Sequence, residues 1–213
     1  MDNKAHWNKV YQNKNVTEVS WFQEHAETSL RLIQQHESNK NANIIDVGAG
    51  ASTLVDDLIQ NGYHNIDLLD ISDDALSVTL NRIRDLDLGA DNTVNFLSGD
   101  ILKIDLQQQH YDIWHDRAVF HFLTTAEARE QYIKQLLGAL KPGGKVIIST
   151  FGPDGPLQCS GLPIVRYDPD SLHNTFGQSF ALLEHGEEDH HTPSGKIQKF
   201  IYCYCKLQKT DNT

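Results

Sequence analysis

The chain has 213 residues, of which 39% are hydrophobic and 22% are charged, as in a soluble globular domain of ordinary composition. Its 29 acidic and 18 basic residues give a formal net charge of -11. So large an acidic excess disfavours binding to nucleic-acid phosphates or to an anionic membrane surface. We therefore expect neither as a partner, and predict a small molecule or a protein as substrate.

Other protein classes are disfavoured by local features. The sequence contains no run of about 18 apolar residues, so no transmembrane helix is expected. The N-terminus lacks the apolar run of a signal peptide. Three cysteines, Cys159, Cys203 and Cys205, form no readable disulfide framework. These features predict a cytoplasmic protein. The polar tail 208–213 is expected to be loose.

Strand-like and helix-like segments alternate along the chain. In the first half we expect helices at 27–35, 54–59 and 75–83 and strands at 43–47, 66–70, 94–97 and 111–115. In the second half we expect a helix at 127–140, a turn at 141–144, a strand at 145–150 and a closing hairpin of 180–184 with 199–203. This alternation predicts an α/β three-layer sandwich with a mostly parallel sheet, whose ligands bind beyond the carboxyl ends of the strands.

A glycine-rich turn, Asp46-Val47-Gly48-Ala49-Gly50, follows the first predicted strand. It resembles half of a dinucleotide-binding turn, but Thr53 replaces the third glycine. The carboxylate of Asp46 would repel a pyrophosphate and suits a ligand that carries a positive group. On its own the motif also fits an ordinary turn between a strand and a helix.

Two further strands end in aspartate. Asp70 follows the glycines by about 20 residues, where a carboxylate can accept hydrogen bonds from ribose hydroxyls. Asp100 can accept from an adenine amine, with Ile101 as an apolar contact. Each aspartate alone fits a turn or a helix cap. Together at successive strand ends they predict a nucleoside-binding site.

With these motifs, and with Lys141-Pro142-Gly143-Gly144 before a strand, the chain from about Ile44 to Cys205 resembles the class I S-adenosylmethionine-dependent methyltransferases. The resemblance implies a Rossmann-like sheet of seven strands whose last strand is antiparallel. The opening Trp7-x-x-x-Tyr11 segment resembles members in which this segment folds over the cofactor. It implies a helical cap at 1–42, a methyltransferase domain at 43–207 and a tail at 208–213.

The resemblance assigns S-adenosylmethionine as the cofactor and gives individual residues expected roles. Asp46 would face the amino group of the cofactor, and the turn at 48–50 would pass its methionine part. Asp70 would hold the ribose, and Asp100 with Ile101 the adenine. The expected cofactor-binding set is Trp7, Tyr11, Trp21, Asp46, Gly48, Ala49, Gly50, Asp70, Ile71, Asp100 and Ile101. The aromatic members also fit plain core packing.

The stretch Trp114–Phe122 follows the fourth predicted strand, where the family places residues that face the substrate. His115, Asp116 and His121 are therefore the expected catalytic residues, and Arg117 is expected to bind substrate. A buried ion pair between Asp116 and Arg117 is the open alternative. The Asn-Pro-Pro-Tyr motif of adenine and glutamine methyltransferases is absent, which disfavours those substrates.

Arg166 and Tyr167 follow a long loop rich in glycine and proline, and are further candidates for binding an anionic substrate group. The loop itself is expected to form a lid or wall of the substrate site, and a rigid connector is the alternative. No metal site is expected, because the cysteines lack a C-x-x-C pair.

The resemblance implies methyl transfer to a small molecule or a protein lysine by in-line displacement. Three alternatives stay open. The first is a metalloid or thiol methyltransferase that uses Cys159, Cys203 and Cys205. The second is a nicotinamide-dependent oxidoreductase, and the third is a non-catalytic module that binds the cofactor. The oligomeric state is not indicated.

Overall fold

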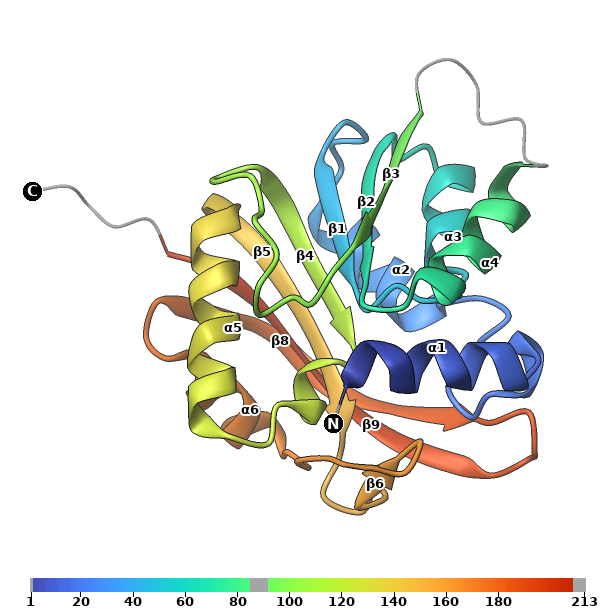
Figure 1. The fold of residues 1–213 in the computed structure, drawn as a ribbon. Coiled ribbons are helices and arrows are strands. Elements are labelled where there is room, and N and C mark those ends of the chain that lie inside the picture. The colour runs from blue at the N-terminus through green and yellow to red at the C-terminus, as the bar shows by residue number, and fades with distance from the viewer. Residues whose placement is uncertain (1, 85–91, 209–213) are drawn as a thin grey trace, which may run out of the picture.

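The structure is a computed structural model that describes residues 2–84 and 92–208. Its main sheet has seven strands in the order β3-β2-β1-β4-β5-β9-β8 (Figure 1). They are β1 (Asn43–Val47), β2 (Asn65–Asp70), β3 (Thr93–Ser98), β4 (Tyr111–Arg117), β5 (Leu140–Phe151), β8 (Phe180–His191) and β9 (Ile197–Leu207). The last strand in the chain, β9, runs antiparallel to both its neighbours, whereas β3, β2, β1, β4 and β5 are mutually parallel. The predicted fold class is confirmed.

Helices cover both faces of this sheet. The helices are α1 (Asn3–Asn13), α2 (Glu27–His36), α3 (Leu54–Gln60), α4 (Asp73–Arg84), α5 (Ala126–Ala139) and α6 (Pro169–Phe176). Helices α2, α3 and α4 pack on one face and α5 and α6 on the other. Central strands are therefore apolar on both sides, so Ile44 faces the first layer and Ile45 the second. Among the described residues, no helix has both the length and the apolar character needed to cross a bilayer.

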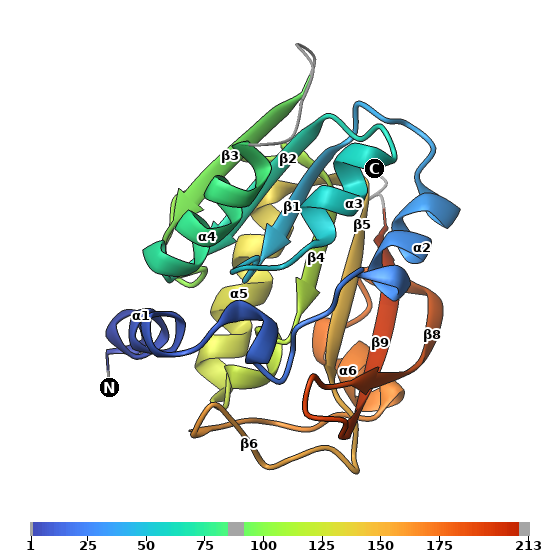
Figure 2. The same cartoon turned by 90° about the vertical axis from the view of Figure 1, so that its right-hand side faces the viewer.

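Helix α1 lies outside these layers, beyond the carboxyl ends of the strands (Figures 1 and 2). None of its residues is buried. Polar contacts join it to the start of α4: the Lys4 Nζ is 2.7 Å from Asp73, and the Gln12 amide donates to Asp74 at 2.8 Å. Helix α1 is thus placed over the strand ends by surface contacts rather than by a core. Helix α2, which was also expected to be part of the cap, packs against the sheet instead.

Several details differ from the sequence-based expectation, among them the closing hairpin, whose strands β8 and β9 are longer than the expected 180–184 and 199–203. Strand β4 continues to Arg117, because its pairing with β1 and β5 continues beyond His115. Strand β5 begins at Leu140, and its register with β4 shifts where Lys141-Pro142-Gly143-Gly144 was expected to form a separate turn. Helix α6 was not predicted. Short elements η1 (Val16–Glu18), η2 (Phe120–Phe122), β6 (Gln158–Cys159) and β7 (Leu162–Pro163) complete the described fold. Most of the tail, 209–213, lies outside the described residues.

Candidate active site

The turn after β1 depends on its two glycines. The backbone N–H groups of Gly48 and Ala49 both donate to the carbonyl of Leu69, at 2.7 and 3.0 Å, which ties this turn to the end of β2. Gly48 and Gly50 have φ angles of +71° and +48°, in the left-handed region that favours glycine. A Cβ on Gly50 would lie 2.6 Å from the Tyr11 hydroxyl, and one on Gly48 would overlap a side-chain methyl. The bare backbone is therefore required for close approach at this turn.

A cavity of about 520 Å³ opens at this edge of the sheet. Its floor is formed by the ends of β1, β2, β3 and β4, and its walls include aromatic side chains from both ends of the chain. The sequence-predicted residues that line it are Trp7, Tyr11, Trp21, Gly48, Asp70, Ile71, Asp100, Ile101 and Arg117. We call this space the main cavity. The structure thus brings the residues of the predicted nucleoside site together.

Asp70 and Asp100 present carboxylates to the main cavity. The Ser72 N–H donates to Asp70 at 2.7 Å, and the Leu102 N–H donates to Asp100 at 3.0 Å, so the following turn orients each side chain. Burial raises the pKa of Asp70 to about 6. The pKa of the Tyr11 hydroxyl is also raised, first by burial and then by the nearby Asp70 carboxylate. A bound group that donates hydrogen bonds to Asp70 would stabilise its charged form.

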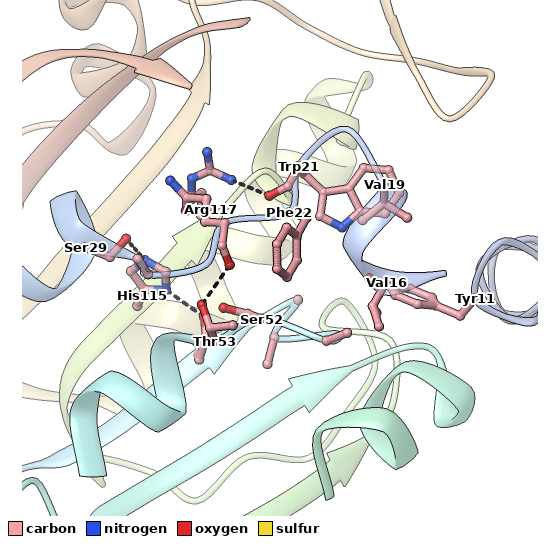
Figure 3. A pocket seen from close by; sticks show the side chains of 16 residues that line it. Tyr11, Val16, Val19, Trp21, Phe22, Ser29, Ser52, Thr53, His115 and Arg117 are labelled. Atoms are coloured by element: carbon pink, nitrogen blue, oxygen red, sulfur yellow. Dashed lines mark hydrogen bonds and ion pairs between the residues drawn. The ribbon is translucent and has the colours of Figure 1, made fainter. Parts of the chain in front are cut away.

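A second, smaller space of about 60 Å³ adjoins the main cavity, and Tyr11, Trp21, Gly48 and Arg117 line both. Figure 3 shows this smaller space from close by, with Tyr11, Trp21 and Arg117 among its labelled lining residues. We call it the small pocket. Asp46 lies in its wall, and one of its carboxylate oxygens, Oδ2, is buried with no hydrogen-bond partner among the described residues. An unsatisfied buried acceptor costs about 1–3 kcal/mol. The donor of a cationic ligand, such as an ammonium group, would remove that cost.

Polar residues at the end of β4 divide between the two faces of the sheet, because strand side chains alternate. His115 and Arg117 point to the α2 side and line the small pocket. Asp116 points to the α5 side and is fully buried. Its Oδ1 accepts from the N–H of Val119 at 2.9 Å, and its Oδ2 accepts from the Tyr132 hydroxyl at 2.6 Å. Asp116 lines neither space, so its geometry is that of a residue that holds the turn after β4.

Arg117 pairs with Glu188 of β8, not with Asp116. Its Nη2 lies 3.1 Å from the Glu188 carboxylate, and its guanidinium lies 4.3 Å from the centre of the Phe200 ring. A further, long hydrogen bond of 3.5 Å reaches the carbonyl of Trp21. The ion pair expected as an alternative between Asp116 and Arg117 does not form, because the two side chains leave β4 on opposite faces.

Ala49 also lines the small pocket, whereas Gly50 and the remaining predicted site residues line neither space. His121 is fully buried against Phe151, with ring centres 4.9 Å apart, and neither ring nitrogen has a partner among the described residues. Burial, with Arg117 as a second cause, lowers the pKa of His121 to about 3. Tyr167 is buried beside Phe120, and Arg166 is exposed and donates to a loop carbonyl at 3.2 Å.

The three cysteines are not brought together. Cys159 lines the main cavity, whereas Cys203 and Cys205 are buried in the core on the α5 and α6 side of β9. Burial raises the pKa of Cys159 to about 11 and that of each of the others to about 12. All three thiols are therefore protonated at neutral pH. Within the described ranges, no group of three or more histidine, cysteine or acidic side chains is arranged to hold a metal ion.

Several lining residues were not found from the sequence. Phe122, Phe151 and Phe200 line the main cavity, and Ser29 lines the small pocket. Phe151 reads as the first residue of the loop rich in glycine and proline, Phe200 as an ordinary strand residue, and Ser29 as an ordinary helix residue. No spacing signal identifies them, because strand pairing and helix packing over long sequence separations bring them to the site.

Comparison with known proteins gives a consistent result. Residues 38–199 match the family described as "Methyltransferase domain". The human protein "EEF1A lysine methyltransferase 2" is 25% identical over 194 residues, which covers 85% of this chain and 75% of that protein. "Malonyl-[acyl-carrier protein] O-methyltransferase 2" of Ilyobacter polytropus is 27% identical over 172 residues, which covers 80% of this chain and 61% of that protein.

Solved structures share the fold. A structure described as "Conversion of a Disulfide Bond into a Thioacetal Group during Echinomycin Biosynthesis" has a TM-score of 0.79 at 16% identity, and covers 99% of this chain and 94% of its own. A "SAM-dependent methyltransferase from Anabaena variabilis" has a TM-score of 0.73 at 16% identity. The match covers 98% of this chain and 96% of the other. The architecture is thus shared over essentially the whole chain at low sequence identity.

Proposed function

The chain belongs to the S-adenosylmethionine-dependent methyltransferases of class I, and from this premise we propose that it methylates a small molecule with an apolar body and a neutral or anionic polar group. The observation that carries this proposal is the lining of the main cavity, which combines aromatic walls with the cation of Arg117. Ligand sites of this kind bury an apolar body and orient it through a few polar groups.

We assign the cofactor to the strand ends. Asp70 would accept from the ribose hydroxyls beside Ile71, and Asp100 with Ile101 would contact the adenine. The unpartnered Asp46 oxygen suits the ammonium of the methionine part. Support comes from the position of these five residues, together with Gly48, around two adjoining spaces.

The protein's task in the reaction is alignment and protection from water. S-adenosylmethionine, when bound, supplies a methyl group made electrophilic by its sulfonium sulfur. Trp7 packs edge-on against Trp21 and Phe122, with ring centres 5.9 and 5.3 Å apart, and these three rings cover the main cavity. The acceptor, oriented against these walls, would attack in line with the bond that breaks.

The charge around the acceptor space favours a neutral or anionic group. Among the described residues that line the main cavity, Asp70 and Asp100 are the acidic ones, and both are assigned to the cofactor. A lysine ammonium must lose a proton before it can attack, and no further lining carboxylate is placed to take it. The charge of Arg117 is paired with Glu188, but its buried Nε–H has no hydrogen-bond partner among the described residues and could donate to a neutral or anionic acceptor group.

Methylation of a protein lysine is the second candidate. Similarity to a lysine methyltransferase over most of the chain favours it, and the ion pair with Glu188 offsets the charge of Arg117. Metalloid or thiol methylation through the cysteines has less support, because Cys203 and Cys205 lie in the core away from Cys159.

Isotope labelling distinguishes the two acceptor classes. The protein is incubated with methyl-labelled S-adenosylmethionine and a cell extract, and ultrafiltration then separates small molecules from protein. The extract is heated beforehand so that its own methyltransferases are inactive, and chromatography of the filtrate separates labelled products from unreacted S-adenosylmethionine. We expect a labelled small-molecule product with wild type and no labelled product in either fraction with Asp70→Ala. Label recovered as methyllysine in the protein fraction would contradict the proposed acceptor class and favour the second candidate.

A further inference from the structure

Three buried side chains form a hydrogen-bonded row beneath the small pocket. The Asp46 Oδ1 lies 2.6 Å from the His115 Nδ1, and the His115 Nε2 lies 2.8 Å from the Ser29 hydroxyl. The three come from β1, β4 and α2, and each is at most 5% exposed. Figure 3 shows Ser29 and His115 side by side at the wall of this pocket.

The chemistry of the three groups determines which atom donates in each hydrogen bond of the row. Asp46 and His115 are register partners on adjacent parallel strands, so their side chains project from the same face. An ionised carboxylate only accepts hydrogen bonds, so the proton of the short contact lies on the His115 Nδ1. The Ser29 hydroxyl can donate to Nε2, which holds the ring in that tautomer and orientation. The imidazole is thereby fixed from both sides, and it fixes one carboxylate oxygen.

Fixing one oxygen of Asp46 determines where the other one points. Oδ2 is buried, has no partner among the described residues, and belongs to a side chain that lines the small pocket. We propose that His115 is a positioning residue that locks the Asp46 carboxylate so that Oδ2 receives the ammonium of the cofactor's methionine part. Ser29 orients His115 in turn. This inference rests on the proposed cofactor site, and it assigns His115 a role in binding rather than in catalysis.

The order Ser29, His115, Asp46 also matches the nucleophile, base and acid of a hydrolase triad. The surroundings do not fit that activity. The adjoining pocket of about 60 Å³ has no room for an acyl substrate, and Ser29 is only 5% exposed. The row therefore orients the Asp46 carboxylate and does not activate Ser29 as a nucleophile.

Two ligands separate this role from a structural one. S-adenosylhomocysteine carries the amino acid end, whereas 5′-methylthioadenosine has the same adenosine and thioether but lacks the ammonium and carboxylate. Both are titrated calorimetrically into wild type, His115→Phe and His115→Asn. Phenylalanine keeps the volume of the ring and removes both hydrogen bonds, whereas the asparagine amide can place a donor near the position of Nδ1.

We expect His115→Phe to weaken S-adenosylhomocysteine by about tenfold, as for loss of one charged hydrogen bond, and to leave 5′-methylthioadenosine nearly unchanged. His115→Asn should recover most of the lost affinity. Ser29→Ala should weaken S-adenosylhomocysteine less than His115→Phe does, and it should likewise leave 5′-methylthioadenosine nearly unchanged. Its matched control is Ser149→Ala, which removes another buried hydroxyl, one that donates to the carbonyl of Ile201.

Equal weakening of both ligands by His115→Phe would reduce the row to a structural role and overturn the inference. Unchanged affinity for both ligands would overturn it as well. If wild type binds neither ligand, the proposed cofactor site fails and the inference fails with it. The wild-type titration therefore distinguishes failure of the site from failure of the positioning role.

Discussion

Asp116 has the chemistry of a catalytic acid, but its contacts are those of a residue that stabilises the fold. Its carboxylate accepts from the N–H groups of Val119 and Phe120 and from the hydroxyl of Tyr132. Burial raises its pKa to about 6, and these donors oppose that shift. The turn that leads from β4 to the cavity wall depends on this one side chain.

We expect Asp116→Ala to lower the free energy of unfolding by about 3 kcal/mol, because it leaves several buried donors without an acceptor. Tyr132→Phe removes only one of them and should cost less. Urea unfolding measures both. The affinity of the folded variant for S-adenosylhomocysteine should change by less than about threefold. A variant of normal stability that has lost cofactor binding would contradict this assignment.

Asp70 should make cofactor affinity depend on pH. Burial raises its pKa to about 6 in the cofactor-free protein, whereas two ribose hydroxyls require the ionised carboxylate as acceptor. Below pH 6 the carboxyl must lose a proton on binding, so affinity should fall as pH is lowered from 7 to 5, by at most about tenfold per unit. Calorimetric titration with S-adenosylhomocysteine at several pH values measures this change.

Asp70→Asn is the matched control, because it cannot ionise. It should bind more weakly, with little change in affinity over the same pH range. The same raised pKa has the opposite sign for folding: the folded protein holds the proton more tightly, so the destabilising contribution of Asp70 is lost as pH falls toward 4. A pH dependence of binding that persists in Asp70→Asn would assign the titration to another group.

At the scale of elements, helix α1 is a cover attached by polar contacts. It has no buried residue, and its link to α4 includes a hydrogen bond between Ser72 and Asn8 at 2.8 Å. Its inner residues Trp7 and Tyr11 nevertheless line the main cavity. Helix α1 therefore contributes more to the site than to the core.

We expect Trp7→Ala to raise the dissociation rate of S-adenosylhomocysteine by about tenfold, because the edge-on contacts with Trp21 and Phe122 are lost. Little change in the free energy of unfolding should accompany it. Stopped-flow fluorescence measures the dissociation rate. Lys9→Ala, an exposed change on the same helix, should leave that rate unchanged. Equal effects of the two substitutions would show that only the stability of the helix matters.

Sequence analysis predicted best those elements whose own residues show a clear pattern. Alternating apolar segments identified β1 to β5 with the helices between them, and glycine turns marked several ends. Strand β4 was predicted two residues too short, because His115, Asp116 and Arg117 look like loop residues until their distant partners are known. Helix α6 was missed although Asp168, Pro169 and Ser171 form a start signal, with Ser171 N–H donating to Asp168 at 2.9 Å.

At the scale of the whole molecule, the half of the site that we assign to the cofactor was more predictable than the half that we assign to the acceptor. Successive parallel strands end at one edge, so Asp46, Asp70 and Asp100 are neighbours by topology alone. The acceptor half combines residues such as Glu188 and Phe200, which reach Arg117 through the pairing of β9 with β5 and β8. Sequence separations of this size leave no local pattern.

Binding at this site should stabilise the entire fold. A ligand at 100 times its dissociation constant adds about 2.7 kcal/mol, which for a chain of this size corresponds to a rise in Tm of about 5–10 °C. Scanning calorimetry with S-adenosylhomocysteine should show this rise, and NAD at equal concentration should show none. A rise with NAD alone would support the oxidoreductase alternative.

Calorimetric titration of S-adenosylhomocysteine into wild type and Asp70→Ala tests the central claim most directly. The account predicts one site per chain with a dissociation constant on the order of micromolar, about -8 kcal/mol. It predicts that Asp70→Ala weakens binding by about tenfold or more, since a charged acceptor of two ribose hydroxyls is lost. Undetectable binding to wild type, or equal affinity in Asp70→Ala, would contradict a cofactor site at the strand ends.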